Sequence, residues 1–192
     1  MNAIASTSDF RPLQSFRPDT LTNPCSRRQC ALRRDILKHL TRRHYSDVLE
    51  VGCATGLLSR ELTRRADRFL GVDCSEGAVL HAREQLAGIS HARVRQGTVP
   101  HCWPKRSFDL IVLGGVLHHF TPTDIRRMAA NCSQALAPHG EIVLISDPLT
   151  NSTRLKGEKA SRDFIRHMQR HRDFALAEHD ASTPHLHFTM QA

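Results

Sequence analysis

The chain of 192 residues carries the stretch Val48-Leu49-Glu50-Val51-Gly52-Cys53-Ala54-Thr55-Gly56, in which a short apolar run is followed by two spaced glycines. Residues 47–52 are typical of a buried parallel strand, because they form a short apolar run with one acid near the end. The glycines predict a tight turn, because a Cβ at either position would hit a ligand or forbid the turn. Residues 56–66 then show helical spacing, so the pattern predicts a strand, a turn and a helix that bring bare backbone under a ligand.

The spacing of these residues indicates what kind of ligand the turn faces. The pattern Glu50-x-Gly52-x-x-x-Gly56 differs from the dinucleotide fingerprint G-x-G-x-x-G, and the Gly-Lys-Ser/Thr of a phosphate-binding loop is absent. The next apolar run, residues 68–73, ends in Asp73 about twenty residues downstream. A carboxylate there can accept both hydroxyls of a ribose. The segment thus has two acids and two glycines but no phosphate-binding motif, a combination that suits a nucleoside with a cationic tail.

With these motifs in place, residues 25–164 resemble the class I S-adenosylmethionine (SAM) methyltransferases. Within that superfamily, the segments Val99-Pro100-His101-Cys102-Trp103-Pro104 and Phe108-Asp109-Leu110-Ile111-Val112-Leu113 are most similar to the nodulation protein S (NodS) branch. That branch N-methylates a deacetylated chitooligosaccharide. The resemblance therefore implies SAM as cofactor and a small-molecule acceptor with an amine or hydroxyl group.

Strands alternate with helices along most of the chain, which predicts an α/β fold with a doubly wound parallel sheet. Ser75 has the character of an N-cap, and Pro138-His139-Gly140 that of a turn. Ligands of such sheets bind beyond the carboxyl ends of the strands. The expected helices are 26–40, 56–66, 76–87 and 123–135, and the expected strands are 47–52, 68–73, 92–96, 108–113 and 141–146.

The two ends of the chain show weaker patterns. Residues 1–24 lack periodicity and contain three prolines, which predicts a poorly ordered leader before a methyltransferase domain over 25–192. Residues 156–170 predict a helix and 185–190 a single late strand. Because the superfamily normally adds two strands here, we expect a shortened C-terminal end and an incomplete sheet edge.

The resemblance also assigns cofactor contacts. Asp73 would bind the ribose, Glu50 would hold the loop or the cofactor amine through water, and Arg28 would pair with the cofactor carboxylate. Thr98 stands where many members carry an acid for the adenine amino group, so the Val99 backbone is a second candidate for the adenine edge. Other residues expected around the cofactor are Cys53, Cys74 and Leu113. Trp103 is interpreted either as a wall near the adenine or as a packed surface residue.

The segment His118-His119-Phe120 follows the fourth expected strand, where superfamily members place groups near the transferred methyl. A histidine with a near-neutral pKa suits an amine or phenol that arrives protonated. His118 and His119 are therefore the catalytic candidates, with helix-start packing as the alternative. The NodS branch more often has two tyrosines here, so this chain departs from its branch at the acceptor side.

Composition bounds the other functions. The formal net charge is +8, but the arginines cluster in helical flanks, which favours a solvated surface over nucleic-acid binding. His167 and His171 have metal-compatible spacing but no supporting motif, so no metal site is predicted. Six cysteines without a C-x-x-C pair, no secretory signal and no long apolar run indicate a reduced, cytoplasmic protein outside membranes.

Three other functions remain open at this point. A nicotinamide oxidoreductase shares the acid after the second strand, but its glycine spacing differs, and Tyr45, the one tyrosine, lies upstream of the first strand. A SAM-fold module without activity is suggested by Thr98 and the shortened end. A basic RNA methyltransferase is suggested by charge alone. The sequence does not name the acceptor or the oligomeric state.

Overall fold

The computed structural model describes residues 27–146, 157–180 and 186–191. The central element is a seven-stranded sheet in the order β3-β2-β1-β4-β5-β7-β6. Strands β1 to β5 are parallel, and β7 pairs antiparallel with both β5 and β6. The elements are α1 Arg27–His39, β1 Tyr45–Val51, α2 Leu57–Thr63, β2 Ala66–Asp73, α3 Glu76–Gln85, β3 Ala92–Gln96, β4 Phe108–Gly114, η1 Leu117–His119, α4 Pro122–Ala135, β5 Leu136–Ser146, α5 Gly157–Met168, β6 Ala175–Asp180 and β7 Leu186–Gln191.

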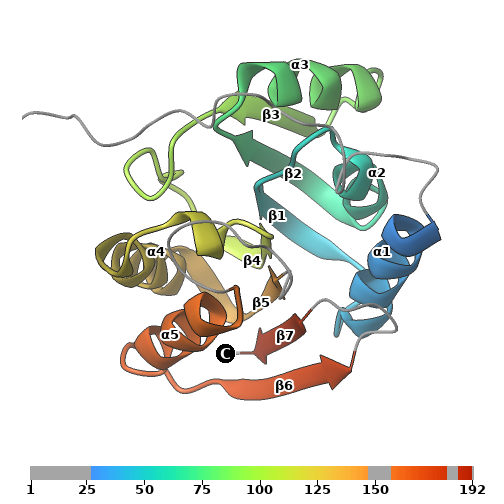
Figure 1. Cartoon of the computed structure of the whole chain (residues 1–192). Coiled ribbons are helices and arrows are strands. Elements are labelled where there is room, and N and C mark those ends of the chain that lie inside the picture. The colour runs from blue at the N-terminus through green and yellow to red at the C-terminus, as the bar shows by residue number, and fades with distance from the viewer. Residues whose placement is uncertain (1–26, 147–156, 181–185, 192) are drawn as a thin grey trace, which may run out of the picture.

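Helices cover both faces of the sheet, which confirms the doubly wound prediction. Figure 1 shows α1, α2 and α3 on one side and α4 and α5 on the other. Along β1 the side chains alternate between two apolar cores: Val48 packs with the first group of helices and Leu49 with the second. Both are fully buried, because the central strand of a parallel sheet has no solvent-facing side.

Helix starts follow local hydrogen bonding. The predicted N-cap Ser75 accepts a hydrogen bond from the Ala78 amide at 3.3 Å. Helix α4 was expected to begin at Thr123, but it begins at Pro122 because Thr121 is the N-cap and accepts from the Asp124 amide at 3.2 Å. Proline suits the first helical position, whose N–H has no helical partner.

Strand β5 is longer than expected, since residues 138–140 are part of it rather than a separate turn. Leu136 pairs with Phe108, and the regular register resumes only with Glu141 opposite Leu110. The irregularity between these pairs takes up the extra residues as a bulge, with His139 at a positive φ of 58°.

The expected shortening of the C-terminal end is wrong. Strand β7 is the late strand that the pattern predicted, but β6 was missed, and together they complete the sheet beyond β5. The sequence of β6, Ala-Leu-Ala-Glu-His-Asp, has no apolar run, because an edge strand leaves much of its surface in water. Leu176 within it is 43% exposed. The predicted leader, residues 1–24, lies outside the described residues.

Candidate functional site

The turn after β1 is fixed to the neighbouring strand by its own backbone. The amides of Gly52 and Cys53 both donate to the Val72 carbonyl, at 2.8 and 3.3 Å. The Gly56 amide donates to the Cys53 carbonyl at 2.9 Å and closes the turn. The loop therefore lies against the carboxyl end of β2, where ligands of parallel sheets bind.

The two glycines are required by the protein itself. Both have positive φ, 78° at Gly52 and 83° at Gly56. A Cβ on Gly52 would lie 2.3 Å from Val116 Cγ1, and one on Gly56 would lie 3.0 Å from the Ala82 Cα in α3. The predicted need for glycine in the turn is confirmed, but the atoms that exclude a side chain are those of β4, its following loop and α3 rather than a ligand.

Asp73 joins β2 to this turn. Its Oδ2 accepts a hydrogen bond from the Ala54 amide at 2.9 Å, and its Oδ1 accepts from the Ser75 amide at 2.9 Å. An ionised carboxylate has about four acceptor positions, so these two bonds leave room for two hydroxyl donors. The side chain is half-buried. The predicted acid thus lies beside the glycine turn and keeps acceptor positions free of these two bonds.

Glu50 is buried behind the turn, at 2% exposure. Its Oε2 accepts a hydrogen bond of 2.5 Å from the Ser59 hydroxyl of α2. Burial raises the pKa of this carboxyl to about 8, with the Ser59 bond acting against the shift and the charge of Asp73 adding to it. The acid is thus held by the protein, as a partly structural role predicts.

This raised pKa gives a testable pH dependence. Because the folded-state pKa of Glu50 lies above its unfolded value, the folded protein binds more protons between about pH 4.5 and 8. The stability contribution of the neutral acid is therefore present below pH 4.5 and is lost as the pH rises through 8. We expect Glu50→Gln, which is always neutral, to gain stability relative to wild type by a few kcal/mol between pH 5 and 8. Urea unfolding at both pH values measures this; a pH-independent difference would contradict it.

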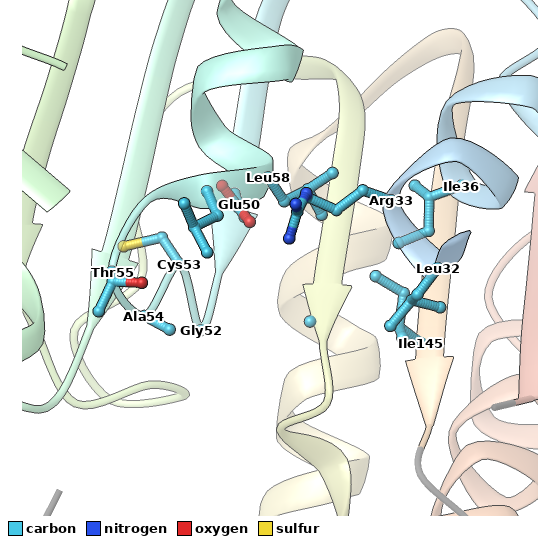
Figure 2. A pocket seen from close by; sticks show the side chains of 12 residues that line it. Leu32, Arg33, Ile36, Glu50, Gly52, Cys53, Ala54, Thr55, Leu58 and Ile145 are labelled. Atoms are coloured by element: carbon cyan, nitrogen blue, oxygen red, sulfur yellow. The ribbon is translucent and has the colours of Figure 1, made fainter. Parts of the chain in front are cut away.

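A cleft opens between the turn and α1 (Figure 2). Its volume is about 480 Å³ including the part open to solvent. Figure 2 shows the turn on one side, Leu32 and Ile36 of α1 on the other, and Arg33 extending toward Glu50 and Leu58. The lining residues are Leu32, Arg33, Ile36, Glu50, Gly52, Cys53, Ala54, Thr55, Leu57, Leu58, Gly114 and Ile145.

Arg33 is the cleft residue that sequence reasoning missed. It was expected to face solvent with the other arginines of this helix, but it is half-buried and its Nη2 donates to Cys30 Sγ at 3.2 Å. In the sequence of α1 it lies between Leu32 and Ile36, which are both buried, and its place beside this apolar side of the helix is the signal that could have found it. Arg28 lies in the first turn of α1, and its side chain is outside the described part of the chain.

The remaining predicted cofactor residues divide by burial. Cys53 is 3% exposed, and burial raises the pKa of its thiol. Cys74 is exposed beyond the end of β2, and Thr98 is half-buried beyond the end of β3. Val99 and Leu113 point into the apolar core, so only their backbones are available to a ligand. Trp103 packs against the same core, which agrees with its interpretation as a packed surface residue.

The two catalytic candidates differ in environment. His118 is 5% exposed, whereas the next residue, His119, is exposed; their ring centroids are 3.9 Å apart. Surrounding protein lowers the pKa of His119 below its ordinary value, while the negative charge of Asp73 acts in the opposite direction. Neutral imidazole is the form that accepts a proton.

Among the described residues, no group of three or more His, Cys, Asp or Glu side chains could hold a metal ion. Within the same ranges, no helix has the length and apolar character needed to cross a membrane. Five of the six cysteines are described, and none of these five forms a disulfide: Cys30, Cys53, Cys74, Cys102 and Cys132.

The donors and acceptors of the cleft fit SAM when they are taken together with Asp73, which is bonded to the cleft residue Ala54. Asp73 has acceptor positions left for ribose hydroxyls. Arg33 supplies a cation and Glu50 an acid at the opposite end of the site, where the amino-acid tail of the cofactor carries a carboxylate and an ammonium. No phosphate-binding motif accompanies them, in keeping with a ligand that has no phosphate.

Comparison with known proteins supports this reading. Residues 48–140 match a family described as a methyltransferase domain. A ubiquinone biosynthesis O-methyltransferase from Bradyrhizobium diazoefficiens is 32% identical over 101 residues, which cover 50% of this chain and 38% of that protein. A nodulation protein S from Rhizobium tropici is 29% identical over 133 residues, 69% of this chain and 55% of that protein. The chain thus spans roughly two fifths to one half of the lengths of these curated relatives.

The fold has close relatives among solved structures. The crystal structure of the N-methyltransferase NodS from Bradyrhizobium japonicum WM9, in complex with S-adenosyl-L-homocysteine (SAH), superimposes with a TM-score of 0.73 at 19% identity. The superposition covers 88% of this chain and 89% of that one. The domain match and the NodS relatives support a class I SAM-dependent methyltransferase near the NodS branch, with SAM as the cofactor, and the solved structure shows that the fold is shared.

Proposed function

We propose that the chain transfers a methyl group from SAM to an amine of a small molecule, with the amine of a deacetylated oligosaccharide as the favoured acceptor. The observation that carries the proposal is the pair of hydrogen bonds that hold the Asp73 carboxylate against the glycine turn. The NodS relatives support N-methylation, while the O-methyltransferase relatives support a hydroxyl acceptor as the alternative.

Cofactor binding in this proposal uses both ends of the cleft. Asp73 accepts the ribose hydroxyls, and the backbone beyond β3, at Thr98 and Val99, meets the adenine edge. Arg33 pairs with the carboxylate of the cofactor, in addition to or in place of Arg28. Glu50 faces the ammonium of the cofactor, whose positive charge would lower the raised pKa of this carboxyl and favour its ionised form. A charge-assisted pair in a half-buried site is stronger than one in water, so these contacts would fix the reacting end.

In methyl transfer, the main contribution of the protein is to position the methyl donor and the acceptor. SAM supplies a methyl group on a positively charged sulfur, and the methyl–sulfur electron pair stays on sulfur as the new bond to the acceptor forms. The residues of the cleft hold the two reactants in line, which supplies most of the rate. His119, exposed and held neutral by its depressed pKa, accepts the proton that an ammonium acceptor must lose. His118 packs beneath it as a positioning residue.

The proposal predicts a large effect at His119. In a methyl-transfer assay with radiolabelled SAM and a panel of amines and alcohols, His119→Gln is expected to lower kcat by about 10²–10⁴, the usual contribution of a general base. The Kd for SAM should stay within twofold, because the residue acts on the acceptor. The wild-type rate should also fall as the pH drops through the depressed pKa of His119, and this acidic limb should disappear in the variant.

The control is His81→Gln, which removes an exposed histidine from α3. Activity of His119→Gln within twofold of wild type would remove this residue from the mechanism, and His118→Asn would then test the other candidate. Tight SAM binding without turnover on any acceptor would favour the alternative of a SAM-binding module. The predicted cytoplasmic location is tested separately by fractionation of cells that express the chain.

A further inference from the structure

A second hollow lies on β2 and β3, outside the cofactor cleft. Its volume is about 930 Å³ including the part open to solvent. Five cationic side chains line it, and none of its ten lining residues, all of them described, is acidic. The five are Arg68, Arg93, Arg95, Lys105 and Arg106. We call this feature the basic groove.

The groove exists because one face of the sheet edge has no helix over it. Arg93 and Arg95 pair in register with Leu70 and Val72, so their side chains share the face of the α4 and α5 core. Helix α3 covers the other face (Figure 1). The connection from β3 to β4, residues 97–107, contains no helix, and its end forms a wall of the groove.

Two of the cations are fixed by one buried acid. Asp47 is 5% exposed, and its two oxygens lie 2.9 Å from Arg68 Nη2 and 2.8 Å from Arg106 Nη2. The Arg106 guanidinium also lies 5.0 Å from the centre of the Phe108 ring. One carboxylate thus holds two guanidinium groups in place and leaves the pair with a net positive charge.

The other cations have no acidic partner among the described contacts. Arg93 Nη1 donates to the carbonyls of Ser90 and Ala92, both at 2.8 Å, and Arg95 Nη2 donates to the Cys102 carbonyl at 2.9 Å. These neutral acceptors orient the guanidinium groups without cancelling their charge. Lys105 is exposed. Like charges gathered in a concavity raise the local concentration of anions.

We propose that the basic groove binds a small anion that carries two or more linked phosphate groups. Four of the five cations are arginines, whose planar fork matches phosphate oxygens in pairs. The cations are spread over two strands and a loop, so one phosphate does not reach them all. Arg68 precedes Asp73 by five residues on β2, roughly 16 Å along a strand, which separates this end of the groove from the methyl-transfer site.

A nucleic acid is less well matched than a small phosphate ligand. Sites for single strands add exposed aromatic rings on which bases stack. Phe69, which lines the groove, is 1% exposed and belongs to the core on the α1–α3 side. His91, the other ring that lines the groove, has its Nε2 3.0 Å from the Thr63 carbonyl oxygen, so the groove offers charge without a series of exposed rings for stacking.

Calorimetric titration of the full chain with inorganic triphosphate tests the proposal. SAH is present at saturation so that the cofactor cleft is closed to the probe; if the chain fails to bind SAH, the titration is run without it, so the two proposals stand or fall separately. We expect one triphosphate per chain. The variant Arg93→Ser with Lys105→Ser, both exposed, should weaken binding tenfold or more. The control Arg60→Ser with Arg170→Ser removes two exposed charges elsewhere and should change the Kd less than twofold.

Each other outcome overturns the proposal. Equal losses in both double variants would mean attraction by diffuse surface charge, which salt screens. Citrate binding as tightly as triphosphate would mean an acid site without preference for phosphate. A single-stranded RNA of about twelve nucleotides that binds ten times more tightly than triphosphate would mean a nucleic-acid surface. No heat of binding at millimolar triphosphate would mean no site.

Discussion

Asp73→Ala is expected to weaken SAM binding by roughly 1–3 kcal/mol, or about five- to 150-fold in Kd. Two losses contribute. The ribose hydroxyls lose the acceptor of their hydrogen bonds. The amides of Ala54 and Ser75, which donate to the carboxylate at 2.9 Å in wild type, lose their acceptor as well. The second loss loosens the turn itself. Calorimetric titration with SAM and with SAH measures the change; both should weaken, because they share the ribose.

Two variants separate the causes. Asp73→Asn keeps the shape but turns an NH2 group toward one of two N–H donors, so it should lie between wild type and alanine. Asp67→Ala removes an exposed acid from the start of the same strand, where it contacts His44, and should leave SAM affinity unchanged. A folded Asp73→Ala protein that binds SAM within twofold of wild type would remove the ribose contact, and with it the basis for the cleft assignment.

The position of Asp73 beside the glycine turn could be predicted from the sequence, because it depends only on the order and direction of the strands. The carboxyl ends of parallel strands meet at one edge, so an acid at the end of the second strand lies beside the turn after the first. Arg33 is a different case. Its place in the cleft depends on how α1 packs on β1 and α2, and the apolar stripe of a helix does not say which border residue turns inward.

Burial explains which elements could be predicted. Strands β1, β2 and β4 lie inside the sheet, and each contains a cluster of buried apolar residues that gives a recognisable pattern. Strand β6 lies at the edge and has two charged residues among six, so periodicity gave no signal. His118 and His119 are adjacent in sequence, and only the 3₁₀ turn that carries them decides which ring is buried.

Gly52→Ala is expected to lower the free energy of unfolding by roughly 2–5 kcal/mol. A positive φ of 78° costs an alanine about 1–2 kcal/mol. The new methyl would also lie 2.3 Å from Val116 Cγ1 and 2.9 Å from the Gly114 carbonyl oxygen, and overpacking of this kind costs about 1–3 kcal/mol. Urea unfolding followed by circular dichroism measures the loss, which is a large part of the stability of an ordinary domain.

Alanine substitutions at two other glycines separate the stability cost of backbone strain from the cost of the steric clash. Gly88 has nearly the same φ, 84°, but a Cβ there would meet nothing within 4 Å, so Gly88→Ala should cost only the strain. Gly77 in α3 has ordinary φ and open space, and Gly77→Ala should stabilise by up to about 1 kcal/mol. Equal losses in Gly52→Ala and Gly88→Ala would mean that the site absorbs the methyl without a clash.

Val116→Ala completes the test, because it removes the atom nearest to the new methyl. Combined with Gly52→Ala, it should recover about 1 kcal/mol of the loss, since the Val116 contact disappears while the Gly114 carbonyl oxygen, a backbone atom, stays at 2.9 Å. Gly52→Ala should also weaken SAM binding, because its backbone clash displaces the turn that Asp73 holds. The double variant should not restore this affinity, since the clash with the Gly114 carbonyl oxygen remains. If the double variant recovered both stability and SAM binding in full, glycine would be required at position 52 only because of the Val116 side chain, and not because the backbones of β1 and β4 approach closely.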